Sequence, residues 1–212
     1  MTNNFFSNVL MAMVLSTGLH AAMTPVYGIP PYTIKCFNDA KASLELEGKV
    51  NENITNKKYI LGKTLEDFGR LQNGKNGIMI GAFDNDELVG HYAVDFTLEK
   101  NMLEHYNKIC PGAGIADCTD YIPIFELKSL MVSPSHWRHG IAGRLLLNFR
   151  DEIKNVVHKL TGKKKFMLMV EVLKDNEASL KAVKKIFDHD LGFHNSPEDN
   201  ELCWYGYNLY EE

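Results

Sequence analysis

Residues 130–143 have the composition of an anion-binding turn. An apolar run ends at Val132, and the chain then enters a turn in which Gly140, Ala142 and Gly143 have little or no side chain. A long helix is expected to begin there, and the backbone N–H groups of its first turn have no partner within the helix. These groups and the helix dipole favour an anion by about 0.3–1 kcal/mol. The stretch therefore predicts a cradle for a pyrophosphate.

Other nucleotide-binding motifs are missing from the sequence. The turn lacks the Gly-Lys-Ser/Thr of a Walker loop, and the chain contains no GxGxxG. A glycine-lined crossover that binds nothing would show the same pattern, so a second signal is needed. Charge provides one, because residues 128–185 carry 13 basic and five acidic residues, a balance of +8, while the rest carries 10 basic and 22 acidic residues, a balance of −12. This segment suits a polyanionic ligand, and the alternative is a solvated helix face rich in lysine.

Hydrophobic periodicity predicts the elements that position this turn. Strands are expected over residues 32–37, 77–83, 88–96, 125–132, 166–172 and 202–209. Helices are expected after Asp39, after Thr64, in an inserted helix and loop within 101–120, from about Gly140 to His158, and from Asp175 or Asn176 to near Phe187. The interleaved order indicates an α/β (α+β) fold.

The sequence resembles the GNAT superfamily of acyl-CoA-dependent N-acetyltransferases from about Tyr32 to Leu209. The cofactor turn of that family reads Val-x-Pro-x-x-(Gln/Arg)-x-x-Gly-x-(Gly/Ala), and Val132, Pro134, Gly140 and Ala142 match it, whereas Trp137 stands at the Gln/Arg position. A second segment, Asn176-Glu177-Ala178-Ser179 followed by Leu191-Gly192-Phe193, is similar to the family's Asn-x-x-Ser/Ala helix that ends in Leu-Gly-Phe. The resemblance implies a mixed, mainly antiparallel sheet flanked by helices and splayed between strands 4 and 5, with acetyl-CoA in the gap.

The same resemblance assigns cofactor-binding residues. It implies that backbone groups of strand 4 pair with the pantetheine arm, that the turn holds the pyrophosphate, and that one asparagine bonds the cofactor near its thiol. These residues are Leu130, Met131 and Val132 for the arm, Arg138, His139, Gly140, Ile141, Ala142 and Gly143 for the pyrophosphate, and Asn176.

Acyl transfer to an amine needs a base, because an amine with a pKa near 10 is mostly protonated at pH 7. Glu126, six residues before Val132, matches the base position of family members that acetylate protein lysines. Glu171, five residues before Asn176, matches that of members that acetylate protein N-termini. For each, the alternative is a carboxylate at the sheet edge that pairs with a neighbouring lysine.

The family's general acid is missing. Its members often carry a Tyr seven residues after the Asn, and that position is Val183 here. Tyr205 or Tyr207 could protonate the leaving thiolate instead, although a Tyr in the last strand more often packs in the core. The thiolate is also a tolerable leaving group without an acid.

The resemblance implies transfer of an acetyl group from acetyl-CoA to a primary amine of a small molecule or peptide by direct attack on the thioester. The alternative is a catalytically silent acyl-CoA-binding regulatory module, motivated by Val183 and Trp137.

The net charge of −4 argues against a nucleic-acid partner. No metal-binding or redox cysteine spacing occurs, buried thiols are expected for the four cysteines, and a homodimer is left open.

The chain length of 212 residues predicts one domain over 32–212 behind an uncharged N-terminal segment and linker, 1–31. That segment is interpreted as a packed or partner-binding helix or, alternatively, as a secretory signal, although it lacks a positive n-region and is too interrupted for a stable membrane span. Because acetyl-CoA is a cytosolic metabolite, the resemblance favours the cytoplasm, and secretion follows only if the segment is a signal.

Overall fold

The computed structural model describes residues 32–55, 62–72, 76–97, 100–113, 124–198 and 200–211. The prediction for residues 1–31 lies outside them. The chain forms two compact units. The first holds the residues up to Ala93 together with Ser129–Leu145, and the second holds Val94–Lys128 and the residues from Leu146 onward.

Strands and helices alternate along the described residues. The strands are β1 (Thr33–Cys36), β2 (Gly77–Asp84), β3 (Glu87–Asp95), β4 (Ile124–Val132), β5 (Phe166–Leu173), β6 (His189–Asn195) and β7 (Leu202–Tyr210). The α-helices are α2 (Ala40–Asn53), α3 (Leu65–Leu71), α4 (Lys100–Ile109), α5 (Ile141–Thr161) and α6 (Glu177–Val183), and the 3-10 helices include η2 (Cys110–Ala113) and η4 (Pro134–His136). Hydrogen bonding orders the strands β1-β2-β3-β4-β5-β7-β6.

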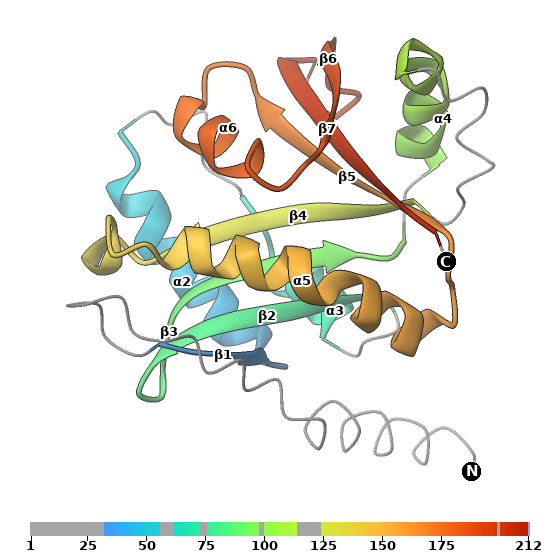
Figure 1. The fold of residues 1–212 in the computed structure, drawn as a ribbon. Coiled ribbons are helices and arrows are strands. Elements are labelled where there is room, and N and C mark those ends of the chain that lie inside the picture. Colours follow the sequence, from blue (N-terminus) through green and yellow to red (C-terminus); the bar gives the residue numbers. More distant parts are fainter. Residues whose placement is uncertain are drawn as a thin grey trace. The chain divides into compact units, whose positions relative to one another are not determined.

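In the first unit, β1, β2 and β3 lie side by side (Figure 1). Asn85, in the two-residue turn between β2 and β3, has φ 55°, as a tight hairpin requires. Asp39 caps α2 by accepting from the Ala42 N–H at 2.9 Å, and Thr64 and Asp67 form the predicted capping box of α3. Both helices bury apolar side chains in one core with β2 and β3.

In the second unit, β5 and β7 pair along their whole length (Figure 1). Phe166–Val170 of β5 is continuously buried, which confirms a central strand covered on both faces. β4 and β5 are parallel, and their paired residues end at Leu127 and Val170, before either strand ends. The predicted mixed, mainly antiparallel sheet that parts between strands 4 and 5 is confirmed.

Two expectations for the C-terminal part were wrong. α6 ends at Val183 rather than near Phe187, because the next residues form a turn in which the Ile186 N–H bonds Val183 O at 2.9 Å. Leu191-Gly192-Phe193 does not end a helix but lies in β6, a strand that periodicity did not predict. Gly192 has φ 85° and a register shift separates it from Asp190, so the alternation that marks a strand is interrupted.

The cysteines also differ from expectation. Cys36 and Cys203 are thiols outside any disulfide, and Cys203 is buried as predicted, but Cys110 in η2 is disulfide-bonded. Within the described ranges, no helix is both long and apolar enough to cross a bilayer.

Candidate active site

The predicted anion cradle is a tight turn between β4 and α5. β4 ends at Val132, η4 follows, and the backbone then takes positive φ values at Arg138 (67°) and Gly140 (74°). The first helical bond of α5 joins the Arg144 N–H to Gly140 O at 3.1 Å, so the amides of residues 141–143 precede it and lack partners within the helix. A non-glycine residue at positive φ costs about 1 kcal/mol or more and is retained only where the surroundings impose it. The backbone conformation of the turn, which exposes these N–H groups, must therefore be stabilised by contacts with neighbouring elements.

One anchor is the close approach of α5 to β3. A Cβ added at Gly90 would lie 3.0 Å from Ile141 Cγ2 and 3.1 Å from Met131 O, so a larger residue would force the first turn of α5 or the end of β4 to shift by a few tenths of an ångström. Beside it, the Ser133 N–H donates to Val89 O at 2.8 Å. These contacts fix where the helix begins.

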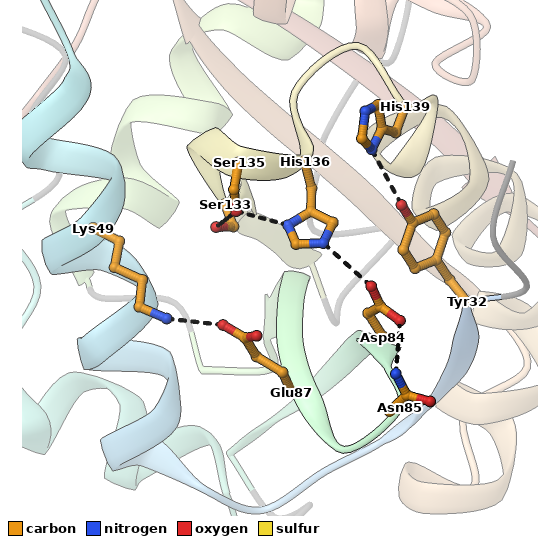
Figure 2. Close-up of polar contacts among 9 residues, drawn as sticks. All are labelled: Tyr32, Lys49, Asp84, Asn85, Glu87, Ser133, Ser135, His136 and His139. Atoms are coloured by element: carbon orange, nitrogen blue, oxygen red, sulfur yellow. Dashed lines mark hydrogen bonds and ion pairs between the residues drawn. The ribbon is translucent and has the colours of Figure 1, made fainter.

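A second anchor is a polar network on the outer side of the turn (Figure 2). Asp84 Oδ2 lies 3.4 Å from His136 Nε2, and His136 Nδ1 lies 2.8 Å from Ser135 Oγ, which is 3.0 Å from Ser133 Oγ. The network ties η4 to the end of β2. Asp84 was not predicted, since nothing local in the sequence indicates that the hairpin reaches the turn.

Figure 2 also shows a link from the turn to the residue before β1. The Tyr32 hydroxyl lies 3.3 Å from His139 Nδ1, and the Arg144 guanidinium lies 5.8 Å from the centre of the Tyr32 ring. Burial and Asp84 raise the pKa of Tyr32, so its hydroxyl keeps its proton. The His139 side chain is thus tied to the residue before β1.

Trp137, the departure from the family pattern, folds back on the end of β4. Its indole N–H donates to Val132 O at 2.7 Å, and 45% of the residue is exposed. The indole N–H occupies the carbonyl of Val132 and makes no hydrogen bond to a backbone N–H of β4. Its ring is large, apolar and accessible beside the turn.

Most of the predicted cofactor residues therefore form one continuous segment of the first unit, comprising Leu130, Met131, Val132, Arg138, His139, Gly140, Ile141, Ala142 and Gly143. Asn176 lies in the second unit, where its Oδ1 caps α6 by accepting from the Ser179 N–H at 3.2 Å. Its side-chain NH2 is the group that could donate to a ligand.

Glu126 is a buried carboxylate on β4. Only 4% of the residue is exposed, and Oε2 lies 3.0 Å from Lys128 Nζ. Burial raises the pKa of Glu126 to about 7, against the opposing effect of the Lys128 ammonium. A carboxyl group with a pKa near neutrality can accept and release protons at working pH, as a general base must.

Glu171 and Tyr205 are register partners on β5 and β7. Glu126 pairs with Met169, two residues before Glu171, so the three predicted catalytic side chains lie on one face of the sheet. Burial, followed by the Glu171 charge, raises the pKa of Tyr205 well above its usual value. The hydroxyl therefore remains protonated throughout the working range and can donate a hydrogen bond, although the raised pKa makes full proton transfer to a thiolate less favourable. Tyr207, the second tyrosine considered, packs in the core and stacks on His189.

Helix α4 packs against this face, where Met102 and Tyr106 share a core cluster with Met169 and Tyr205. Tyr106 is fully buried, with its ring 6.2 Å from that of Tyr205, and the His105 ring lies 5.3 Å from it. Burial, then Glu126 and Glu171, raise the pKa of Tyr106. Tyr106 is thus close enough to Glu126, Glu171 and Tyr205 to interact with all three.

Two residues beside the base were missed as members of the site. Lys128 follows Glu126 at the two-residue spacing that puts side chains on one strand face, so the sequence contained a signal for it. Glu198, in the connection between β6 and β7, lies 3.3 Å from Lys128 Nζ. Its place could not be predicted while β6 was unrecognised.

A sequence comparison identifies the class of protein. The model of the acetyltransferase (GNAT) family matches residues 51–188, and the chain belongs to this family. No curated protein matches the sequence.

Solved structures share the fold at low sequence identity. A GNAT-family acetyltransferase from Streptococcus pneumoniae is 15% identical, with 84% of this chain and 99% of that one covered and a TM-score of 0.54. The ribosomal-protein-S18-alanine N-acetyltransferase from Escherichia coli is 14% identical, with coverage of 85% and 95% and a TM-score of 0.52. Arabidopsis thaliana NAA60, solved with a bisubstrate analogue, is 15% identical, with coverage of 85% and 99% and a TM-score of 0.52. At these identities the likeness establishes the fold alone.

Proposed function

We propose that the protein transfers an acetyl group from acetyl-CoA to a primary amine of a small molecule or peptide. Family membership supports acyl transfer from an acyl-CoA to an amine. That the chain catalyses this transfer rather than only binding the cosubstrate depends above all on one observation, the buried Glu126 carboxyl beside Lys128, whose pKa burial raises to about 7. Glu126 removes one proton from the ammonium, and the neutral amine attacks the thioester carbon to give a tetrahedral intermediate whose nitrogen is positively charged. That nitrogen loses its second proton to water, and the C–S bond breaks as the intermediate collapses to the amide and the thiolate. Tyr205 protonates the departing thiolate.

The turn holds the cosubstrate in this proposal. The pyrophosphate of acetyl-CoA binds the amides of residues 138–143, the pantetheine arm pairs with Leu130, Met131 and Val132, and Asn176 donates near the thiol. The amides of residues 141–143, which precede the first helical bond of α5, and the positive φ of Gly140 fit this group, since an anion there accepts hydrogen bonds that the helix does not. Acetyl-CoA supplies the activated acyl group, and the chain supplies binding and the proton acceptor.

Substitution of Glu126 by Gln tests the assignment. We expect kcat to fall about 10²–10⁴-fold while acetyl-CoA affinity measured by calorimetry stays nearly constant. CoA thiol release is followed with polyamines, aminoglycosides, arylalkylamines and lysine peptides, and Glu45→Gln, on an exposed face of α2, is the matched control. An unchanged kcat removes Glu126 from the mechanism and transfers the role of base to Glu171.

The second candidate is a silent acyl-CoA-binding regulatory module. One observation favours it: Val183, a buried residue of α6, stands where the family often has a tyrosine as general acid, and a valine side chain has no proton to donate. Tight binding of acetyl-CoA without turnover on any amine of the panel would establish it. Absence of any binding at millimolar acetyl-CoA would refute both functions.

We propose a cytoplasmic location because acetyl-CoA is made and used there. The disulfide at Cys110 is the observation against it, since such bonds are typical of oxidising compartments. Intact mass after alkylation in denaturant without a reductant counts the thiols, including buried Cys203, and the mass of the N-terminus reveals any cleavage. Four alkylated thiols and an uncleaved N-terminus would support the cytoplasm, whereas two alkylated thiols, as the Cys110 disulfide implies, would support an oxidising compartment.

A further inference from the structure

Lys128 bridges two carboxylates in the second unit. Its Nζ lies 3.0 Å from Glu126 Oε2 and 3.3 Å from Glu198 Oε1. Exposed side-chain fractions are 5% for Glu126, 18% for Lys128 and 49% for Glu198, so the chain of charges runs from the interior to solvent.

The surroundings of Glu126 are otherwise unfavourable to a negative charge. Among the described residues, the charged groups that act on it are Lys128 on its own strand, Glu171 on β5 and Glu198 in the β6–β7 connection. The neighbouring titratable hydroxyls are Tyr106 on α4 and Tyr205 on β7, and both keep their protons. Lys128 is therefore the cation of this group, and two carboxylates oppose it.

We propose that Lys128 is a positioning residue that keeps the Glu126 carboxylate in its ionised, proton-accepting form, and that Glu198 weakens this effect by competing for the same ammonium. The inference rests on the proposed function of Glu126 as the base. Lys128 itself transfers no proton in the reaction.

The charge on Lys128 is stable enough for this role. Burial disfavours the ammonium, but Glu126 and Glu198 outweigh burial and raise the pKa of Lys128. Without the ammonium, Glu126 would be a buried carboxylate with only like charges nearby, and protonation would be its least costly state. At neutral pH the base would then already carry the proton that it should accept.

Glu198 acts in the opposite direction. It repels Glu126 directly, and it shares the Lys128 ammonium. Because its side chain is half exposed, water and salt screen its effect more than that of the buried pair. Removing Glu198 should therefore make Glu126 easier to ionise, whereas removing Lys128 should make it harder.

The test titrates Glu126 directly in protein labelled with ¹³C at the glutamate δ-carbon, with the Glu126 resonance assigned by its loss in Glu126→Gln. In Lys128→Met the titration midpoint should rise by about one pH unit or more, whereas Lys128→Arg should keep it near the wild-type value. In Glu198→Gln it should fall by about 0.2–0.7 pH unit, the effect of a screened charge. Lys163→Met, which removes an exposed lysine outside the site, is the control.

Kinetics on one amine then connect the titration to turnover. A rise of one pH unit from a midpoint near 7 leaves about a tenth of the carboxyl groups ionised at pH 7, so Lys128→Met should lose about fivefold in kcat/KM there and regain most of it at pH 9. The amine's own titration is the same for all variants. A variant damaged only in its structure would lose activity by the same factor at both pH values.

Several results would overturn the inference. Unmoved midpoints in Lys128→Met and Glu198→Gln, or midpoints that move in the same direction, show that the ammonium does not control ionisation. A shifted midpoint with no shift in the pH profile separates Lys128 from catalysis. If wild-type protein binds acetyl-CoA but turns over no amine, the proposed function fails, while the titration still decides whether Lys128 controls Glu126.

Discussion

His91, in the middle of β3, should make the protein less stable in acid. The residue is completely buried, and its ring forms edge contacts with Phe37 (centroids 5.8 Å apart) and Phe68 (5.6 Å). Burial lowers the pKa of His91 to about 4. We consider the change in the free energy of unfolding when the pH falls from 8 to 5, in the wild type and in a variant that lacks this imidazole.

The magnitude follows from proton linkage. In the unfolded chain His91 titrates near its ordinary pKa of about 6.5, so between roughly pH 6.5 and 4 the unfolded state binds a proton that the folded state refuses. Its contribution to stability is complete above pH 6.5 and is lost as the pH falls toward 4. Between pH 8 and 5 the loss is about 2 kcal/mol, which is about 4–8 °C in Tm for a chain of this size.

The assay compares thermal unfolding of wild type and His91→Leu across this pH range. The difference between the two proteins isolates His91, because other groups such as Glu126 titrate in both. We expect the Tm difference to move in favour of His91→Leu as the pH falls. A difference that stays constant from pH 8 to 5 would refute the linkage argument, even if the variant is less stable at every pH.

Three further changes probe the site. Gly90→Ala should push the start of α5 away from β3 and raise the KM for acetyl-CoA. Gly48→Ala, where an added Cβ meets nothing within 4 Å, should stabilise α2 by about 0.5–1 kcal/mol, and equal KM values in the two variants would contradict the role of Gly90. Acetyl-CoA binding should change the fluorescence of exposed Trp137, so the change should vanish in Trp137→Phe, in which buried Trp204 still emits; a surviving signal would place the ligand elsewhere. Tyr205→Phe should lower kcat about tenfold to 10²-fold without changing the KM for acetyl-CoA, and an unchanged kcat would mean that the thiolate leaves unaided.

The parts of the fold that the sequence predicted are those encoded by local signals. The caps of α2 and α3 depend on side chains three residues apart, and the tight hairpin depends on polar residues between two apolar runs. The turn before α5 is also local, because glycine at residue 140 and the strand-to-helix change lie within a few residues. Such features need no knowledge of distant contacts.

The parts that could not be predicted depend on long-range pairing. β6 breaks its alternation at Gly192 and pairs with β7 across a bulge, so its sequence alone resembles a loop. Without β6, neither the position of Glu198 beside Lys128 nor its effect on Glu126 could be inferred. Asp84 meets His136 across 52 positions of sequence for the same reason. The candidate bases could therefore be predicted from their places in the sequence motifs, whereas the position of Glu198 beside Lys128, which changes the ionisation of Glu126, could not.

Burial and the Lys128 charge act on Glu126 in opposite directions, and the reaction needs both. Proton transfer from an ammonium with a pKa near 10 to an ordinary carboxylate near 4.3 is unfavourable by about 8 kcal/mol, and burial that raises the carboxyl pKa to about 7 halves this cost. Burial without a counter-charge would raise the pKa further, and the base would be protonated before the amine arrives. Lys128 limits the increase, so that a stronger base than ordinary glutamate is still ionised in about half of the molecules at pH 7.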